Sequence, residues 1–120
     1  MVKRVLVVED DEDSREMLRA LLETKGFEVI TAENGLEGLE AAKAERPDII
    51  VTNICMPKLD GVGLIEYIRE QPEFDTVPIV VLSAVGSGDR SRAVKAGADQ
   101  VMTKPVDPSA LIVSMDKLFG

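Results

Sequence analysis

The sequence predicts an α/β fold in which five βα units form a doubly wound (βα)5 domain with a parallel sheet. Short, continuous apolar runs alternate with segments of helical periodicity along the chain, the pattern of strands that helices cover on both faces. β-branched residues dominate four of the five runs, as is typical of buried strands. The length of 120 residues and the 45% apolar content suit one core. We therefore expect a single domain over residues 1–120.

Five apolar runs are the expected strands. Each run is followed by polar or turn-forming residues and then by a helical period. The fifth run is the weakest, because only two apolar residues and their flanks form it. The expected strands are residues 5–8, 27–31, 49–51, 79–82 and 101–102 with its flanks.

The first expected helix begins in an acidic segment. Asp13 is the candidate N-terminal cap, with Glu16 three residues later, and Gly26 ends the helix. An apolar stripe marks the side that we expect to face the core. The stripe consists of Met17, Leu18, Leu21 and Leu22.

The second and third helices begin at capping residues and end before prolines. Asn34 with Glu37 opens the second helix, which must stop before Pro47 because the residue preceding a proline disfavours helical dihedrals. The third helix follows Asp60 and ends near Pro72. Its expected apolar face consists of Leu64, Ile65 and Ile68.

The last two helices differ in how clearly the sequence marks them. The fourth runs over about residues 87–97 and offers only Ala93, Val94 and Ala96 for burial. The fifth begins at Asp107 and Pro108, a good pair for a cap and a first helical position. Its expected inner face consists of Leu111, Ile112, Met115, Leu118 and Phe119.

Polar residues stand at the carboxyl ends of four of the expected strands. Glu9 and Asp10 follow the first strand, and Asn53, Ser83 and Lys104 follow the third, fourth and fifth. Ligands of open parallel sheets bind beyond these strand ends. Each residue taken alone is explained by capping or by solvation of a strand end. Their joint placement predicts one site.

The residue types at this edge indicate chemistry with a metal ion and a phosphoryl group. Adjacent carboxylates without histidine or cysteine side chains suit a hard cation such as Mg²⁺. Lys104 and Ser83 suit the charge and the oxygens of a phosphoryl group. Asn53 has an amide where covalent phosphoryl chemistry would need a carboxylate nucleophile.

Four short motifs carry a resemblance to a known family. They are residues 6–10, residues 53–57 with 60–61, residues 83–84, and residues 98–99 leading to 103–105. With them the chain resembles, over essentially its whole length, the response-regulator receiver domains of bacterial two-component signalling. The resemblance implies a flavodoxin-like strand order of 2-1-3-4-5 and a cis bond between Lys104 and Pro105.

The resemblance also implies roles for the edge residues. Glu9 and Asp10 match the acidic pair that holds Mg²⁺, and the main-chain carbonyl of Cys55 matches a further ligand. Ser83 matches the switch hydroxyl and Lys104 the lysine that contacts the phosphoryl group. The implied partners are a sensor histidine kinase or phosphotransfer protein and a downstream effector protein.

Three residues depart from the family pattern. Asn53 stands at the position of the phosphate-accepting aspartate, which is also a metal ligand. Either the chain has been altered there to block phosphorylation, or it is an atypical receiver by nature. Val101 replaces the aromatic residue that couples to the switch hydroxyl, and Val106 stands where phenylalanine is common. The usual coupling therefore cannot operate in its ordinary form.

The composition excludes several other classes of function. A net charge of -8 is the wrong sign for gripping a nucleic-acid backbone. With no histidine and one cysteine, imidazole triads and zinc sites of several thiolates are excluded, and a phosphoryl-donating histidine must come from a partner. No segment is long and apolar enough to span a membrane. We expect a cytoplasmic protein without direct membrane or nucleic-acid contact.

Three interpretations of function follow from these residues. The first is a signalling receiver, built to take a phosphoryl group at residue 53 but unable to do so with Asn53. The second is an interaction scaffold that works without phosphorylation. The third, a small Mg²⁺-dependent phosphatase, lacks a nucleophile and a substrate cleft in the sequence. We therefore expect a protein that is not an enzyme.

Overall fold

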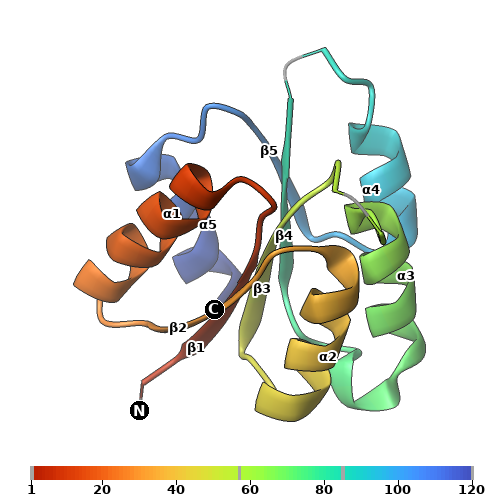
Figure 1. The fold of residues 1–120 in the computed structure, drawn as a ribbon, viewed down its shortest axis with the longest axis horizontal. Helices are drawn as coiled ribbons and strands as arrows, with labels where there is room; N and C mark the ends of the chain where they lie inside the picture. Colours follow the sequence, from red (N-terminus) through yellow and green to blue (C-terminus); the bar gives the residue numbers. More distant parts are fainter. Residues whose placement is uncertain (1, 57, 85, 120) are drawn as a thin grey trace.

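The computed structural model describes residues 2–56, 58–84 and 86–119, so Pro57 of the second motif lies outside the described residues. A five-stranded parallel sheet with the order β2-β1-β3-β4-β5 forms the centre (Figure 1), which confirms the predicted fold. The strands are β1 (Arg4–Val8), β2 (Glu28–Ala32), β3 (Ile49–Asn53), β4 (Ile79–Ser83) and β5 (Gln100–Thr103). The helices are α1 (Glu12–Thr24), α2 (Gly35–Glu45), α3 (Gly61–Glu70), α4 (Arg90–Ala96) and α5 (Pro108–Phe119), with a short 3-10 helix η1 (Pro72–Phe74).

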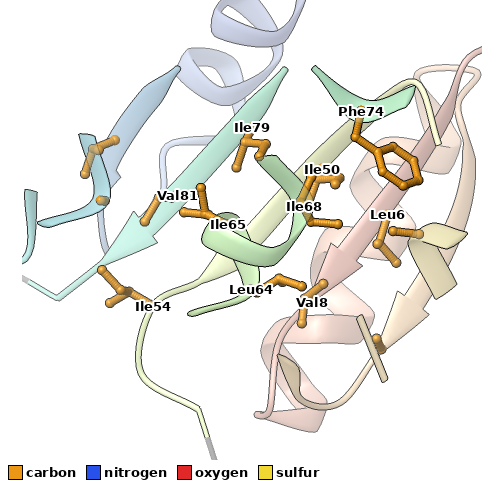
Figure 2. Packing of buried hydrophobic residues seen from close by; sticks show 14 residues of the cluster. Leu6, Val8, Ile50, Ile54, Leu64, Ile65, Ile68, Phe74, Ile79 and Val81 are labelled. Atoms are coloured by element: carbon orange, nitrogen blue, oxygen red, sulfur yellow. The ribbon is translucent and has the colours of Figure 1, made fainter. Parts of the chain in front are cut away.

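The helices form two layers, one on each face of the sheet. Helices α1 and α5 cover one face, and α2, α3 and α4 cover the other (Figure 1). Alternate side chains of β1 enter the two cores because successive side chains of a strand point to opposite faces. Leu6 and Val8 pack with the α3 side chains (Figure 2), whereas Val5 and Val7 pack with α1 and α5. Burial on both faces explains why the central strands β1, β3 and β4 are nearly continuous apolar runs.

The start of α1 differs from the prediction. Asp11, not Asp13, is the cap: its backbone is extended and its carboxylate accepts a hydrogen bond from Ser14 N at 2.9 Å. Asp13 lies in the first helical turn, because the chain enters α1 soon after leaving β1. Met17, expected on the core side of the helix, is 57% exposed. The buried stripe follows Leu18 and Leu22, from which Met17 is rotated away.

The other helix signals are mostly confirmed. Asn34 and Asp60 cap α2 and α3 by accepting hydrogen bonds from Glu37 N and Gly63 N at 2.9 and 2.8 Å. Asp107 accepts from Ser109 N at 3.0 Å at the start of α5. These caps satisfy amide groups that the first helical turn leaves without partners.

Helix α4 buries less than predicted. Ala93 is its buried residue and Ala96 packs partly against the core, but Val94 is 54% exposed. Ala93 and Ala96 are three residues apart and share one helix face, whereas Val94 is turned away from that face. On α5, the prediction is borne out, since Leu111 and Met115 are buried and Ile112, Leu118 and Phe119 pack partly against the same core. No helix in the described ranges has the length and apolar character needed to cross a membrane.

A close backbone contact at Gly61 holds the start of α3 against the residue that follows β3. Gly61 N donates to the Ile54 carbonyl oxygen at 2.7 Å. A Cβ atom on Gly61 would lie 2.8 Å from the Ile54 Cα, which is main chain and cannot move aside. On Gly63, in contrast, a Cβ would meet the flexible Leu59 side chain at 2.6 Å.

We expect Gly61→Ala to destabilise the fold by about 1–3 kcal/mol, as overpacking against fixed atoms does. Gly63→Ala is the matched control in the same helix, where the Leu59 side chain can adjust. Urea unfolding of the two variants measures the difference. Equal stabilities would show that the backbone contact at Gly61 is not a constraint.

Candidate functional site

The predicted site residues lie together at the carboxyl edge of the sheet. Glu9 and Asp10 follow β1, and Lys104 follows β5, as predicted. Asn53 and Ser83 are the last residues of β3 and β4, whereas the sequence predicted that they follow these strands. Because β1 and β3 are neighbours in the sheet, the ends of these strands bring Asn53 beside the acidic pair.

The Asn53 amide is the centre of the hydrogen-bond network. Its Nδ2 lies 2.9 Å from Asp10 Oδ1, 3.2 Å from Glu9 Oε2 and 3.1 Å from the Cys55 carbonyl oxygen. Its Oδ1 accepts a hydrogen bond from Ile54 N at 2.9 Å. The amide nitrogen carries two hydrogens, so one of them is shared between two of the three oxygens, and only the amide oxygen can accept from a backbone N–H. The surroundings therefore fix the amide orientation.

Glu9 is a buried acid with polar partners on both carboxylate oxygens. The residue is 1% exposed. Its Oε1 accepts from Lys104 Nζ at 2.9 Å, and its Oε2 accepts from Asp11 N at 3.0 Å as well as from the Asn53 amide. A buried carboxylate is tolerated only when it is paired and hydrogen-bonded. Lys104 thus supplies the counter-charge that this part of the core requires.

Asp10 and Asp11 add negative charge at the solvent side of the site. Burial tends to raise the pKa of Asp10, but the hydrogen bond from the Asn53 amide and the charge of Lys104 outweigh it and lower that pKa. The pKa of Asp11 is lowered chiefly by the hydrogen bond from Ser14 N. Both carboxylates are therefore ionised at neutral pH.

Ser83 takes part in the site through its main chain. Lys104 N donates to the Ser83 carbonyl oxygen at 2.7 Å, which ties the segment after β5 to the end of β4. The Ser83 residue is buried at 5% exposure. Within the part of the chain that the structure describes, its hydroxyl makes no hydrogen bond to the Asn53 network. The structure thus joins four of the five predicted side chains and leaves that of Ser83 apart.

The oxygen atoms around Asn53 are of the chemical types that bind a hard cation. Two carboxylates and one main-chain carbonyl are ligands that Mg²⁺ accepts. The described residues contain no cluster of three acidic, thiol or imidazole side chains that could hold a metal, because the third group is the Asn53 amide. The donor set fits Mg²⁺ only if that amide turns its oxygen toward the ion.

Arg15 belongs to the site although its sequence context does not indicate a role. This α1 residue is buried, and its guanidinium donates to the Glu9 carbonyl oxygen at 3.0 Å and lies 3.5 Å from a Glu33 carboxylate oxygen. An arginine in an acidic helix is usually a solvated residue, so its charge gave no signal. The one available signal was its spacing of three residues before the buried Leu18, which places both on one helix face.

An apolar groove of about 600 Å³ adjoins the site between α1 and the segment after β5. Glu9 and Lys104 are among the residues that line it. The Lys104–Pro105 peptide bond in this segment is cis, as the resemblance implies. The apolar lining includes Met17, Leu18, Pro105, Val106 and Pro108. The exposed Met17 side chain therefore borders the functional edge.

Comparison with known proteins identifies the family. The model of the response regulator receiver domain matches residues 5–116. The chain belongs to the response regulator receiver domain family. Receiver domains are regulatory units of two-component signalling that interact with histidine kinases or phosphotransfer proteins and with effectors.

Two relatives show how the receiver domain is used in other proteins. The chain is 44% identical over 109 residues to the transcriptional regulatory protein CseB of Streptomyces coelicolor, covering 90% of this chain and 45% of CseB. It is 31% identical over 121 residues to the polar-differentiation response regulator DivK of Brucella anthropi, covering 100% of this chain and 98% of DivK. The chain thus spans about half of one relative and nearly all of the other.

Solved structures agree with the receiver fold. The receiver domain of a sensor histidine kinase from Pseudomonas aeruginosa, which carries a magnesium ion in its active site cleft, superposes with a TM-score of 0.93 at 28% identity. The match covers 100% of this chain and 99% of that domain. A response regulator from Chloroflexus aurantiacus superposes with a TM-score of 0.94 at 30% identity, covering 98% of both chains.

Removing the counter-charge of Glu9 should weaken the receiver fold. We expect Lys104→Met to lower the free energy of unfolding by about 1–3 kcal/mol, because a buried carboxylate loses its charged donor. Lys95→Met removes an exposed lysine of α4 and serves as the control. Urea unfolding at matched salt measures both changes. A loss no larger for Lys104 than for Lys95 would contradict the pairing.

A third carboxylate at position 53 should also destabilise the metal-free chain. Two like charges about 4 Å apart cost on the order of 4 kcal/mol at an effective dielectric of 20. Since Lys104 and water relieve part of this repulsion, we expect Asn53→Asp to lower the free energy of unfolding by about 1–3 kcal/mol in chelator. Added Mg²⁺ should narrow the gap by binding the folded Asp form.

Urea unfolding in chelator and then in Mg²⁺ tests this expectation. Gln100→Glu is the matched control, because it makes the same amide-to-carboxylate change at an exposed position of β5. If Asn53→Asp were as stable as the unaltered chain in chelator, the three side chains would not converge as the structure places them.

Proposed function

We propose that this chain is a receiver module of two-component signalling in which Asn53 occupies the phospho-acceptor position and prevents phosphorylation. The observation that supports the proposal is the position of the Asn53 amide. It lies at the end of β3, within hydrogen-bond distance of Glu9, Asp10 and the Cys55 carbonyl. A carboxylate in this place would lie beside both acidic residues and within reach of any cation they hold.

The chemistry of an amide explains why the chain should not accept a phosphoryl group. Transfer from a phosphohistidine forms a bond between phosphorus and the attacking oxygen and breaks the bond to the histidine nitrogen. A carboxylate oxygen supplies the required negative charge and electron pair, whereas an amide oxygen is neutral and weakly nucleophilic. The donor histidine must belong to a partner, since this chain has none.

The other edge residues keep the roles that a receiver requires. We assign Glu9, Asp10 and the Cys55 carbonyl as groups that would hold Mg²⁺, together with residue 53 when its side chain presents an oxygen to the ion; the ion would supply positive charge to the phosphoryl oxygens. Lys104 would contact the phosphoryl group, and its ammonium already lies beside this edge, 2.9 Å from Glu9 Oε1. Ser83 would act as the switch hydroxyl.

An unphosphorylated receiver has to act through protein contacts. We propose as partners a sensor histidine kinase or phosphotransfer protein and a downstream effector, and a cytoplasmic location. One observation favours a role as a scaffold independent of phosphorylation: Val101, at the position of the usual aromatic switch residue, is 4% exposed. A small buried side chain offers no ring that could move between an outer and an inner position.

Phosphoryl transfer to the unaltered chain should be absent. Incubation with acetyl phosphate or a phosphorylated histidine kinase in Mg²⁺ should leave its intact mass unchanged, while Asn53→Asp should gain one phosphoryl group. Asn53→Ala is the control that removes the amide without adding a nucleophile. A phosphoryl group mapped to residue 53 of the unaltered chain would refute the proposal. Failure of Asn53→Asp to react would contradict the assignment of the acceptor position.

A further inference from the structure

We propose that the Asn53 side chain is an internal substitute for the cation, so that it competes with Mg²⁺ instead of serving as a weakened ligand. Its NH2 group fills the place among Glu9, Asp10 and the Cys55 carbonyl where an ion bound by these oxygens has to lie. The inference rests on the proposed function only for the assignment of these oxygens to a metal site.

The distances show that the amide nitrogen and an ion would share one place. The Asn53 Nδ2 lies 2.9 to 3.2 Å from one oxygen of Asp10, one of Glu9 and the Cys55 carbonyl. Mg²⁺ binds its oxygen ligands at about 2.0–2.1 Å. An ion that contacts these three oxygens therefore falls in the space between them, which the NH2 group occupies. The partial positive charge of the N–H groups faces the carboxylates as a cation would.

Turning the amide to admit an ion has a cost at Ile54. The Asn53 Oδ1 accepts from Ile54 N at 2.9 Å. A half turn about the Cβ–Cγ bond would point the oxygen at the ion and bring the NH2 group against that backbone N–H. Two donors would then face each other, and the Ile54 N–H would lose its acceptor. A buried or partly buried donor without a partner is unfavourable.

The groups around Glu9 also reduce the electrostatic gain that a bound ion would bring. Both carboxylate oxygens of Glu9 already accept hydrogen bonds, from Lys104 Nζ on one side and from Asp11 N on the other. The ammonium of Lys104 supplies one positive charge next to the two acids. These contacts already offset part of the negative charge that a bound cation would offset.

The Asn53→Ala variant distinguishes a competitor from a ligand. If Asn53 were a ligand through its oxygen, its removal would weaken Mg²⁺ binding. If it competes, Asn53→Ala should bind Mg²⁺ about five- to tenfold more tightly than the unaltered chain, the factor that one hydrogen bond contributes. Asn53→Asp should bind more tightly than both. Isothermal titration with MgCl2 at fixed ionic strength gives the three dissociation constants.

A second variant, a thermal measurement and a control complete the test. Asn53→Ser, whose short hydroxyl cannot reach all three oxygens, should follow Asn53→Ala, and this variant serves if the alanine form does not fold. Thermal unfolding in chelator and in Mg²⁺ should shift the melting temperature of Asn53→Ala more than that of the unaltered chain. Gln100→Ala, at an exposed site, should titrate like the unaltered chain.

The outcomes separate this inference from the proposed function. If Asn53→Asp binds Mg²⁺ but Asn53→Ala binds no more tightly than the unaltered chain, the inference is wrong and the receiver site stands. If even Asn53→Asp does not bind Mg²⁺, the metal site itself is wrongly assigned, and both proposals lose their basis.

Discussion

The burial of the Glu9 carboxylate is the constraint on which the functional edge depends. An acid that is 1% exposed needs donors on both oxygens, and no single element of the fold supplies them. Lys104 comes from the end of β5, the Asp11 amide from the start of α1, and the Asn53 amide from the end of β3. The ends of β3 and β5 and the start of α1 thus all donate hydrogen bonds to the same buried carboxylate.

The order of the strands makes this convergence possible. β1 lies between β2 and β3, and Val8 pairs with Thr52, so the next residues of the two strands, Glu9 and Asn53, meet at the edge. The backbone contact between Gly61 and Ile54 directs the chain from β3 into α3. The packed sheet thus sets where the ends of β1 and β3 meet.

The sequence predicted those features that a local pattern determines. Continuous apolar runs defined the strands because both sheet faces are covered, and Asn34 and Asp60 were recognisable caps. Asp11 was missed because Asp13 offers the same side chain two residues later, and only the path out of β1 decides between them. The orientation of the Asn53 amide and the burial of Arg15 could not be predicted, since both depend on partners distant in the chain.

The central claim is that the Asn53 NH2 group is held among three oxygens and takes the place of an ion. The most direct test is nuclear magnetic resonance of its side-chain amide protons, with the exposed Gln100 amide as the reference in the same sample. The account predicts that the Asn53 protons exchange with solvent more slowly than those of Gln100, and equally slowly in chelator and in Mg²⁺ at a concentration that saturates Asn53→Asp. Exchange as fast as that of Gln100, or a large change of the Asn53 signals at that Mg²⁺ concentration, would contradict it.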